Sequence, residues 1–163
     1  MLAFSFSTLE KNTNIRILMS RVHLLNEYEK SDTISKWRLW QYRSPNGRCA
    51  IDDWRKCLSV GAPRADFDTF MRDMVKLHKW EPPDFEPLHG QQSGFQELRW
   101  KSAKVQHRIL GYIVRDREFG MLIGCTHKES YDPPDALTTL LKRKSMIDAG
   151  EASLVEYRLI LNR

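Results

Sequence analysis

Apolar side chains dominate residues 37–42, where Trp37, Leu39 and Gln41 alternate with Arg38, Trp40 and Tyr42, and this pattern predicts a strand rich in aromatic residues. Residues 44–47, Ser-Pro-Asn-Gly, have the composition of a turn after that strand. Upstream of Lys36 no strong period is present. We therefore expect an N-terminal arm of unknown role at residues 1–35, in which Met19 is an alternative start, and a folded domain from Lys36 onward.

Two helices are predicted next. Apolar residues between positions 50 and 58 fall on one helical face, and residues 61–63, Gly-Ala-Pro, stop that helix. A second apolar stripe with helical spacing runs from residue 67 to residue 78. Residues 80–83 end it, because a residue that precedes a proline disfavours the α region. The pattern predicts a helical hairpin.

Three strands follow, at residues 95–101, 105–115 and 119–127. The connections between them are short, so we expect an antiparallel meander. The third strand is apolar on both faces, which suits a central, covered position in a sheet.

A last helix is predicted to begin with Asp132 as N-cap and Pro133 at the first helical position. The domain then extends over residues 36–147, and residues 148–163 are expected to be a C-terminal tail. The resulting order is β-α-α-β-β-β-α, an α+β fold with a mostly antiparallel sheet packed by the helical hairpin and the C-terminal helix.

The 163-residue chain has a net charge of +5 and a pI near 9.2. A basic domain attracts polyanions such as nucleic acid, although the same charge also suits an acidic protein partner or solubility. No apolar stretch reaches the roughly 20 residues of a membrane-spanning helix, and the N-terminal residues lack a secretory pattern. We predict a cytoplasmic protein without membrane association. The three cysteines have no metal-binding spacing, and we predict neither a metal nor a cofactor.

Cationic side chains recur at alternate positions of the predicted meander. Period two places Arg99 and Lys101 on one face of the first strand, with Leu98 on the other. Arg108 falls in the second strand, and Ile109 points the opposite way. A sheet can gather these cations into one concave basic site, although a solvated polar face produces the same alternation.

Further polar residues lie at the ends of these strands. Lys104 is in the first connection, and His127 and Lys128 end the third strand beside the loop that holds Tyr131. His127 is a candidate acid or base because histidine titrates near neutral pH; a structural role is equally typical of a histidine at a strand end. Tyr131 can stack on a base, donate a proton or simply pack.

Four segments, in this order and spacing, resemble the RelE/ParE toxin superfamily, and above all its phage-derived-protein branch near the HigB toxins. They are YRSPNGRCAIDDW, GFQELRW, HRILGYIV and THKESYDPPDAL. Together they span most of residues 36–147. One departure is Glu129, which follows Lys128 where many relatives have a second lysine, and which weakens the local positive field.

The resemblance implies a RelE-like fold and a metal-independent endoribonuclease that acts on mRNA in the ribosomal A site. The RNA 2′-OH attacks the adjacent phosphate in that reaction. Arginine is always charged and forks onto phosphate oxygens, which suits Arg99 and Arg108. The proton acceptor is His127, or a lysine whose pKa is lowered by neighbouring cations. The implied catalytic residues are Arg99, Lys101, Arg108, His127 and Lys128, and the implied RNA-binding residues are Lys104 and Tyr131.

Three functional hypotheses follow from the resemblance. The first is the toxin of a type II toxin–antitoxin system, with mRNA on the ribosome as its target and an antitoxin, of helix-turn-helix type, encoded nearby. The second is a non-enzymatic inhibitor of DNA gyrase, as in the ParE branch. The third is an inactive phage-derived domain that binds only nucleic acid or a partner. Membership of a fold does not by itself decide among them.

Overall fold

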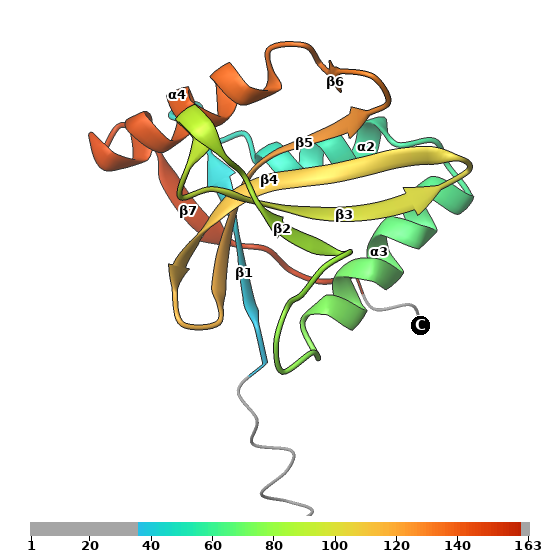
Figure 1. The fold of residues 1–163 in the computed structure, drawn as a ribbon. Coiled ribbons are helices and arrows are strands. Elements are labelled where there is room, and N and C mark those ends of the chain that lie inside the picture. Colours follow the sequence, from blue (N-terminus) through green and yellow to red (C-terminus); the bar gives the residue numbers. More distant parts are fainter. Residues whose placement is uncertain (1–35, 161–163) are drawn as a thin grey trace, which may run out of the picture. The chain divides into compact units, whose positions relative to one another are not determined.

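The computed structural model describes residues 36–160, which form an α+β unit that begins at Lys36 (Figure 1). The predicted arm, residues 1–35, and Met19 lie outside the described residues. The helices are α2 (Ala50–Cys57), α3 (Ala62–Met74) and α4 (Ala136–Asp148), with a 3₁₀ turn at Gly90–Gln92. The strands are β1 (Arg38–Arg43), β2 (Phe85–Pro87), β3 (Gln96–Ser102), β4 (Val105–Arg115), β5 (Glu118–His127), β6 (Tyr131–Asp132) and β7 (Ser153–Glu156).

The described strands form one mixed sheet in the order β2-β3-β4-β5-β1-β7, and β6 pairs with β5. The pairs β3–β4 and β4–β5 are antiparallel, which confirms the predicted meander. β1 pairs with β5 in parallel, and the other pairs are antiparallel. β5 is buried along most of its length, as its apolar sequence predicted.

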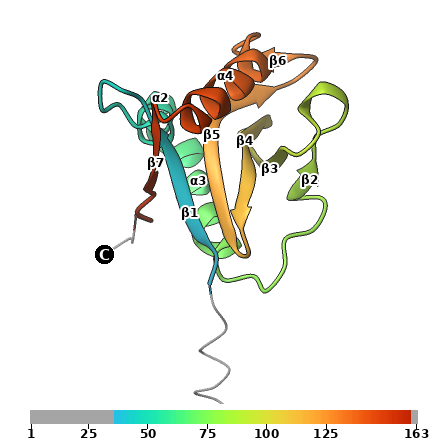
Figure 2. The same cartoon turned by 90° about the vertical axis from the view of Figure 1, so that its left-hand side faces the viewer.

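Each face of the sheet is covered by helix. The hairpin α2–α3 packs on one face, where Leu98, Ile109 and Phe119 join Phe67 of α3 in a core cluster. α4 lies across the opposite face, where Leu140 packs among side chains of β4 and β5 (Figures 1 and 2). Because α4 covers only part of its face, side chains of β3 and β4 beside it stay accessible to solvent.

One glycine sets how closely α2 approaches the sheet. A Cβ atom on Gly124 of β5 would lie 2.2 Å from the ring of Trp54, so only glycine permits this packing. Trp54 also meets Trp100 of β3 edge to face, with 5.7 Å between the ring centroids. The aromatic residues of the predicted helix and strand therefore build the core beneath the hairpin.

Several predicted boundaries differ from the structure. Residues 61–63 were expected to stop the first helix, but that helix ends at Cys57, and Ala62 begins α3 with Pro63 in its first turn. Proline is favoured in the first turn because its missing N–H is not needed there. α3 ends at Met74 rather than near residue 78. β2, β6 and β7 were not predicted.

The predicted start of the last helix was also wrong. Asp132 is not its N-cap, because Asp132 belongs to β6 and pairs with Thr126 of β5. The N-cap is Asp135, whose carboxylate accepts a hydrogen bond from the Thr139 hydroxyl at 3.0 Å. Strand pairing with β5 outcompetes the capping preference at Asp132, and the helix begins one turn later than the sequence indicated.

The sheet also continues beyond residue 147, where the sequence placed the end of the domain. β7 pairs with β1 in antiparallel register, and Tyr157 is buried in the core beneath the hairpin. Part of the predicted tail therefore belongs to the folded unit. Among residues 36–160, no helix is long and apolar enough to cross a membrane.

Candidate functional site

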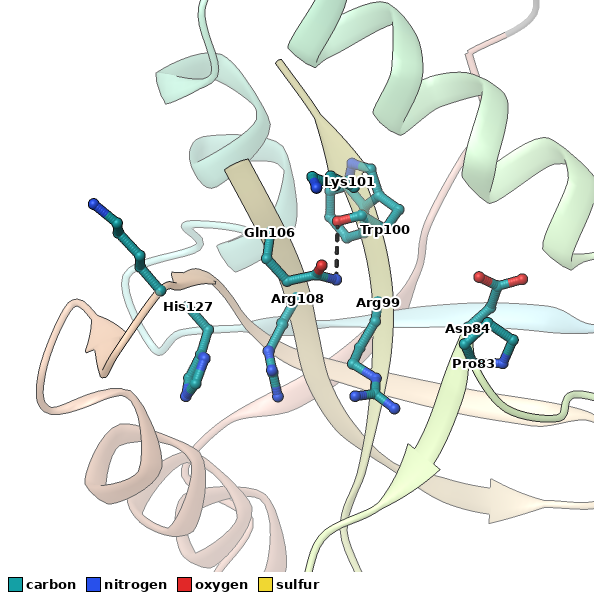
Figure 3. A pocket seen from close by; sticks show the side chains of 9 residues that line it. Pro83, Asp84, Arg99, Trp100, Lys101, Gln106, Arg108 and His127 are labelled. Atoms are coloured by element: carbon teal, nitrogen blue, oxygen red, sulfur yellow. Dashed lines mark hydrogen bonds between the residues drawn. The ribbon is translucent and has the colours of Figure 1, made fainter. Parts of the chain in front are cut away.

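An open pocket of about 460 Å³ lies on the sheet face that α4 only partly covers. All five residues predicted to be catalytic line it, namely Arg99, Lys101, Arg108, His127 and Lys128. Pro83, Asp84, Trp100 and Gln106 complete the lining. Figure 3 shows the side chains of Arg99, Arg108 and His127 extending in the same direction from neighbouring strands.

Strand register brings the two arginines together. Arg99 of β3 and Arg108 of β4 are direct cross-strand partners, and Arg108 is in turn the partner of Cys125 on β5. His127 lies two residues beyond Cys125, so it shares the face of the two arginines. The alternation in the sequence allowed Arg99 and Arg108 to share a face, and the pairing of the strands makes them neighbours.

A buried carboxylate lies beside the arginines. Glu97 has only 5% of its side chain exposed, and it accepts two hydrogen bonds from Arg108 Nη1, each at 2.6 Å. Arg99 Nε lies 3.6 Å from Glu97 Oε1, and the Tyr131 hydroxyl lies 3.4 Å from Glu97 Oε2. A carboxylate in so little solvent requires such charged partners, so Glu97 holds this group of side chains together.

A second carboxylate, that of Glu86 on β2, pairs with Arg99 Nη2. Glu86 is 40% exposed and lies directly opposite Glu97 in the register of β2 and β3. Asp84 lines the same pocket and accepts a backbone hydrogen bond from Arg99. The inner part of the pocket is therefore not simply basic, because each arginine is paired with a glutamate.

His127 lies beside this network at the end of β5. Its ring meets that of Tyr131 edge to face, with 4.7 Å between centroids. Burial, and then the neighbouring charge of Arg108, lower the pKa of His127 below its usual value, while Glu97 acts in the opposite direction. The ring is therefore neutral at pH 7 and can accept a proton.

Tyr131 contacts Arg108 and Glu97 but does not line the pocket. The Arg108 guanidinium lies 5.6 Å from the centre of the Tyr131 ring, a cation–π contact. Its hydroxyl is already engaged with Glu97. Burial, followed by the charge of Glu97, raises the pKa of Tyr131, so the phenol remains protonated.

The lysines occupy the outer part of the site. Lys101 and Lys128 line the pocket, and within residues 36–160 neither has a carboxylate at ion-pair distance. Lys104 is not part of the lining; it lies in the β3–β4 turn, is exposed, and has a positive φ of 65°. The structure thus brings together every predicted site residue except Lys104, although Tyr131 contacts Arg108 instead of lining the pocket.

Sequence reasoning missed the carboxylates. Glu97 shares the face of Arg99 by the same period of two, so the alternation could have revealed it. Glu86 had no comparable pattern, because β2 has only three residues and its place beside Arg99 depends on pairing with β3. The described residues contain no group of three His, Cys, Asp or Glu side chains arranged to hold a metal ion.

Comparisons with known proteins find no matching family model, no matching curated protein and no matching solved structure. The geometry of this pocket and the motifs of the sequence are therefore the basis for a functional assignment.

Proposed function

We propose that this domain is a RelE/ParE-type toxin that cleaves mRNA on the ribosome, with the RNA 2′-OH as nucleophile. The main support is a single pocket in which Arg99, Arg108 and His127 point the same way from three adjacent strands (Figure 3). Phosphodiester cleavage by a 2′-OH requires charge stabilisation, a proton acceptor and a proton donor, and the two arginines and the neutral histidine supply the first two. The motif order and the antiparallel meander are further support.

In the proposed reaction the scissile phosphate lies against Arg99 and Arg108. Each guanidinium offers several N–H donors in a fixed plane, which matches the oxygens of a phosphate whose negative charge increases in the transition state. Lys101 and Lys128, without carboxylate partners in the described part of the chain, attract the flanking RNA backbone. Tyr131 keeps Arg108 in place through its ring.

The proton transfers follow from the same geometry. The neutral ring of His127 accepts the proton of the 2′-OH while the 2′ oxygen forms a bond to phosphorus. The bond from phosphorus to the 5′ oxygen breaks, and that oxygen takes a proton from the ammonium group of Lys101 or Lys128. The products are a 2′,3′-cyclic phosphate and a 5′-hydroxyl.

One observation favours a second candidate, a domain that binds nucleic acid or a partner without cutting. Glu86 and Glu97 neutralise both arginines, which reduces the positive potential of the inner pocket. Glu129 after Lys128 has the same effect at its rim. In this alternative the lysines attract the polyanion and no proton transfer occurs.

Induced expression in a bacterial host tests the two candidates. The toxin assignment predicts growth arrest, with primer extension revealing new 5′ ends inside translated codons, and it predicts that His127→Gln at equal expression relieves the arrest. Unchanged growth with full-length mRNAs, at confirmed expression, contradicts cleavage and favours the binding domain. Arrest with intact mRNA and altered plasmid supercoiling points instead to gyrase.

A toxin of this kind needs a partner that silences it. We infer an antitoxin, encoded beside this gene, whose acidic segment covers the pocket or displaces α4, because complementary charge speeds association. Protease footprinting of the co-expressed pair is the test. Protection of the β3–β4 region is the expected result, and Arg99 and Lys101 remaining accessible in the complex rules out direct occlusion.

A further inference from the structure

The two glutamates of the site, Glu86 and Glu97, differ in how much of each side chain is exposed to solvent. Glu86 and Glu97 lie directly opposite each other on β2 and β3, an arrangement that repels unless cations lie between the two charges. Arg108 pairs with Glu97 and Arg99 pairs with Glu86. Glu97 is 5% exposed and Glu86 is 40% exposed, so only Glu86 is free to move its carboxylate into water.

The side chain of Glu86 can move away from Arg99 without disturbing the fold. β2 is a three-residue edge strand, and its first residue, Phe85, packs beside Trp80 and Phe119. Phe85 therefore anchors the strand while the Glu86 side chain points the opposite way. Rotation of that side chain breaks one partly exposed ion pair, which contributes little to stability.

The carboxylate of Glu86 occupies a place that suits a phosphate. A guanidinium recognises carboxylate and phosphate oxygens with the same planar donors. Arg99 lines the pocket and uses Nη2 for Glu86, whereas its Nε faces the buried Glu97. A phosphate that binds Arg99 through Nη2 therefore competes with Glu86 and leaves Glu97 in place.

We propose that Glu86 is an internal anion that holds the phosphate position on Arg99 until the backbone of the RNA displaces it. This inference rests on the proposed function for the identity of its ligand, while the competition itself concerns phosphate in general. Its consequence is selectivity. A small anion that breaks the ion pair between Glu86 and Arg99 gains only one new contact, with Arg99. An RNA strand that breaks the same pair also gains contacts with Arg108, Lys101 and Lys128.

The variant Glu86→Gln tests the competition with two probes. The first is inorganic phosphate, read as the increase in melting temperature over chloride at equal ionic strength, since a ligand that binds the folded state stabilises it. The second is an RNA oligonucleotide with 2′-O-methyl groups, which cannot be cleaved, read by fluorescence anisotropy. We expect Glu86→Gln to bind both probes about threefold to fivefold more tightly, as loss of one exposed ion pair implies.

The matched control is Glu81→Gln. Glu81 is an exposed carboxylate paired with Lys79 at 2.6 Å and lies outside the pocket lining, so its removal changes the net charge equally. We expect little change for this variant. We also expect the gain from Glu86→Gln to vanish in an Arg99→Gln background, because the competition is for Arg99.

The two probes separate the two proposals. Equal phosphate affinity in Glu86→Gln and the wild type overturns the competition, whatever RNA does, and so does an equal gain in Glu81→Gln. Tighter phosphate binding by Glu86→Gln without RNA binding by either protein supports the competition and contradicts the RNA-cleaving function.

Discussion

Arg108 on β4 donates from Nη1 to both carboxylate oxygens of Glu97 on β3, each at 2.6 Å, and Glu97 is buried. The two residues lie diagonally across the strand pair, since Arg108 is opposite Arg99 and Glu97 is opposite Leu110. Because Arg108 lies on the polar, partly exposed side of β4, an alanine at this position would by itself be expected to spare the fold. The buried partner reverses that expectation, because a carboxylate without its cation is costly in so little solvent.

Arg108→Ala is therefore expected to lower the free energy of unfolding by about 3–5 kcal/mol. Urea denaturation measures this loss. The double variant Arg108→Ala/Glu97→Gln should recover most of it, because no charge is then left unpaired. Equal losses in the single and double variants would show that the ion pair is not the cause. Arg108→Lys, which keeps a cation, is the better variant for activity.

Two isoleucines of β4 offer a matched test of the sheet. Ile109 is fully buried beneath the helical hairpin, whereas Ile113 is 38% exposed beyond a bulge in the β4–β5 pairing. Ile109→Asp should abolish folding, because an unpaired charge would be buried, and Ile113→Asp should leave a folded protein. Circular dichroism and soluble yield compare the two, and a folded Ile109→Asp protein would contradict the assigned faces of β4.

The long elements of the fold were predictable because their side chains repeat. The meander β3–β4–β5 and the hairpin followed from periods of two and of 3.6, which report which face is buried. β2, β6 and β7 contain two to four residues, too few for a period, and they exist because a neighbouring strand offers hydrogen bonds. The parallel pairing of β1 with β5 likewise has no local pattern.

The same distinction applies to the site. Arg99 and Arg108 could be placed on one face from alternation alone, and His127 from the end of its strand. The carboxylates that neutralise the arginines were not predicted, because their ion pairs depend on strand register and on a short edge strand. A sequence therefore predicts which cations share a face better than it predicts their net charge.

Alanine variants of Lys101 and Lys104 distinguish the effect of a contact inside the pocket on RNA binding from the effect of the overall positive charge. Lys101 lines the pocket and Lys104 lies in the adjacent turn, so both alanine variants lose one charge only. Lys101→Ala should weaken binding of uncleavable RNA more than Lys104→Ala, and should reduce the salt dependence of log Kd by about one unit of slope. Anisotropy titrations at several salt concentrations measure both effects. An equal effect of the two variants would mean that binding is not centred on the pocket.

We expect His107 to make the stability sensitive to acid. It lies on the hairpin face of β4, stacked on Trp100 with 5.3 Å between centroids, and neither ring nitrogen has a hydrogen-bond partner among the described residues. Burial lowers the pKa of His107, and the charge of Asp66 opposes that effect. Below about pH 6.5, the usual histidine pKa, the unfolded chain therefore binds more protons than the folded one.

Stability should fall as the pH drops below that value, with a slope of at most about 1.4 kcal/mol per pH unit from this residue. His107→Phe keeps an aromatic ring against Trp100 and removes the titrating group. Urea midpoints from about pH 5 to about pH 7.5 should then fall less steeply than in the wild type. Parallel curves for the two proteins would assign the acid sensitivity to other groups.

The C-terminal residues should prove essential to folding, although the sequence suggested a tail. A chain that ends at Gly150 loses β7, which pairs with β1, and also Tyr157, which packs near Phe67. It also loses the hydrogen bond from the Tyr157 backbone N–H to the Leu39 carbonyl at 2.8 Å. Removal of one large buried aromatic side chain alone costs about 3–5 kcal/mol, a large share of the stability of a small domain.

We therefore expect the chain ending at Gly150 to be insoluble or to melt far below the full-length protein in thermal denaturation. A chain ending at Ile160 retains every described element and is the control. A chain starting at Ser35 retains β1 and should also fold, since β1 begins at Arg38. Stable folding of the chain ending at Gly150 would mean that β7 is an accessory strand. Failure of the chain starting at Ser35 would mean that residues before Ser35 belong to the folding unit.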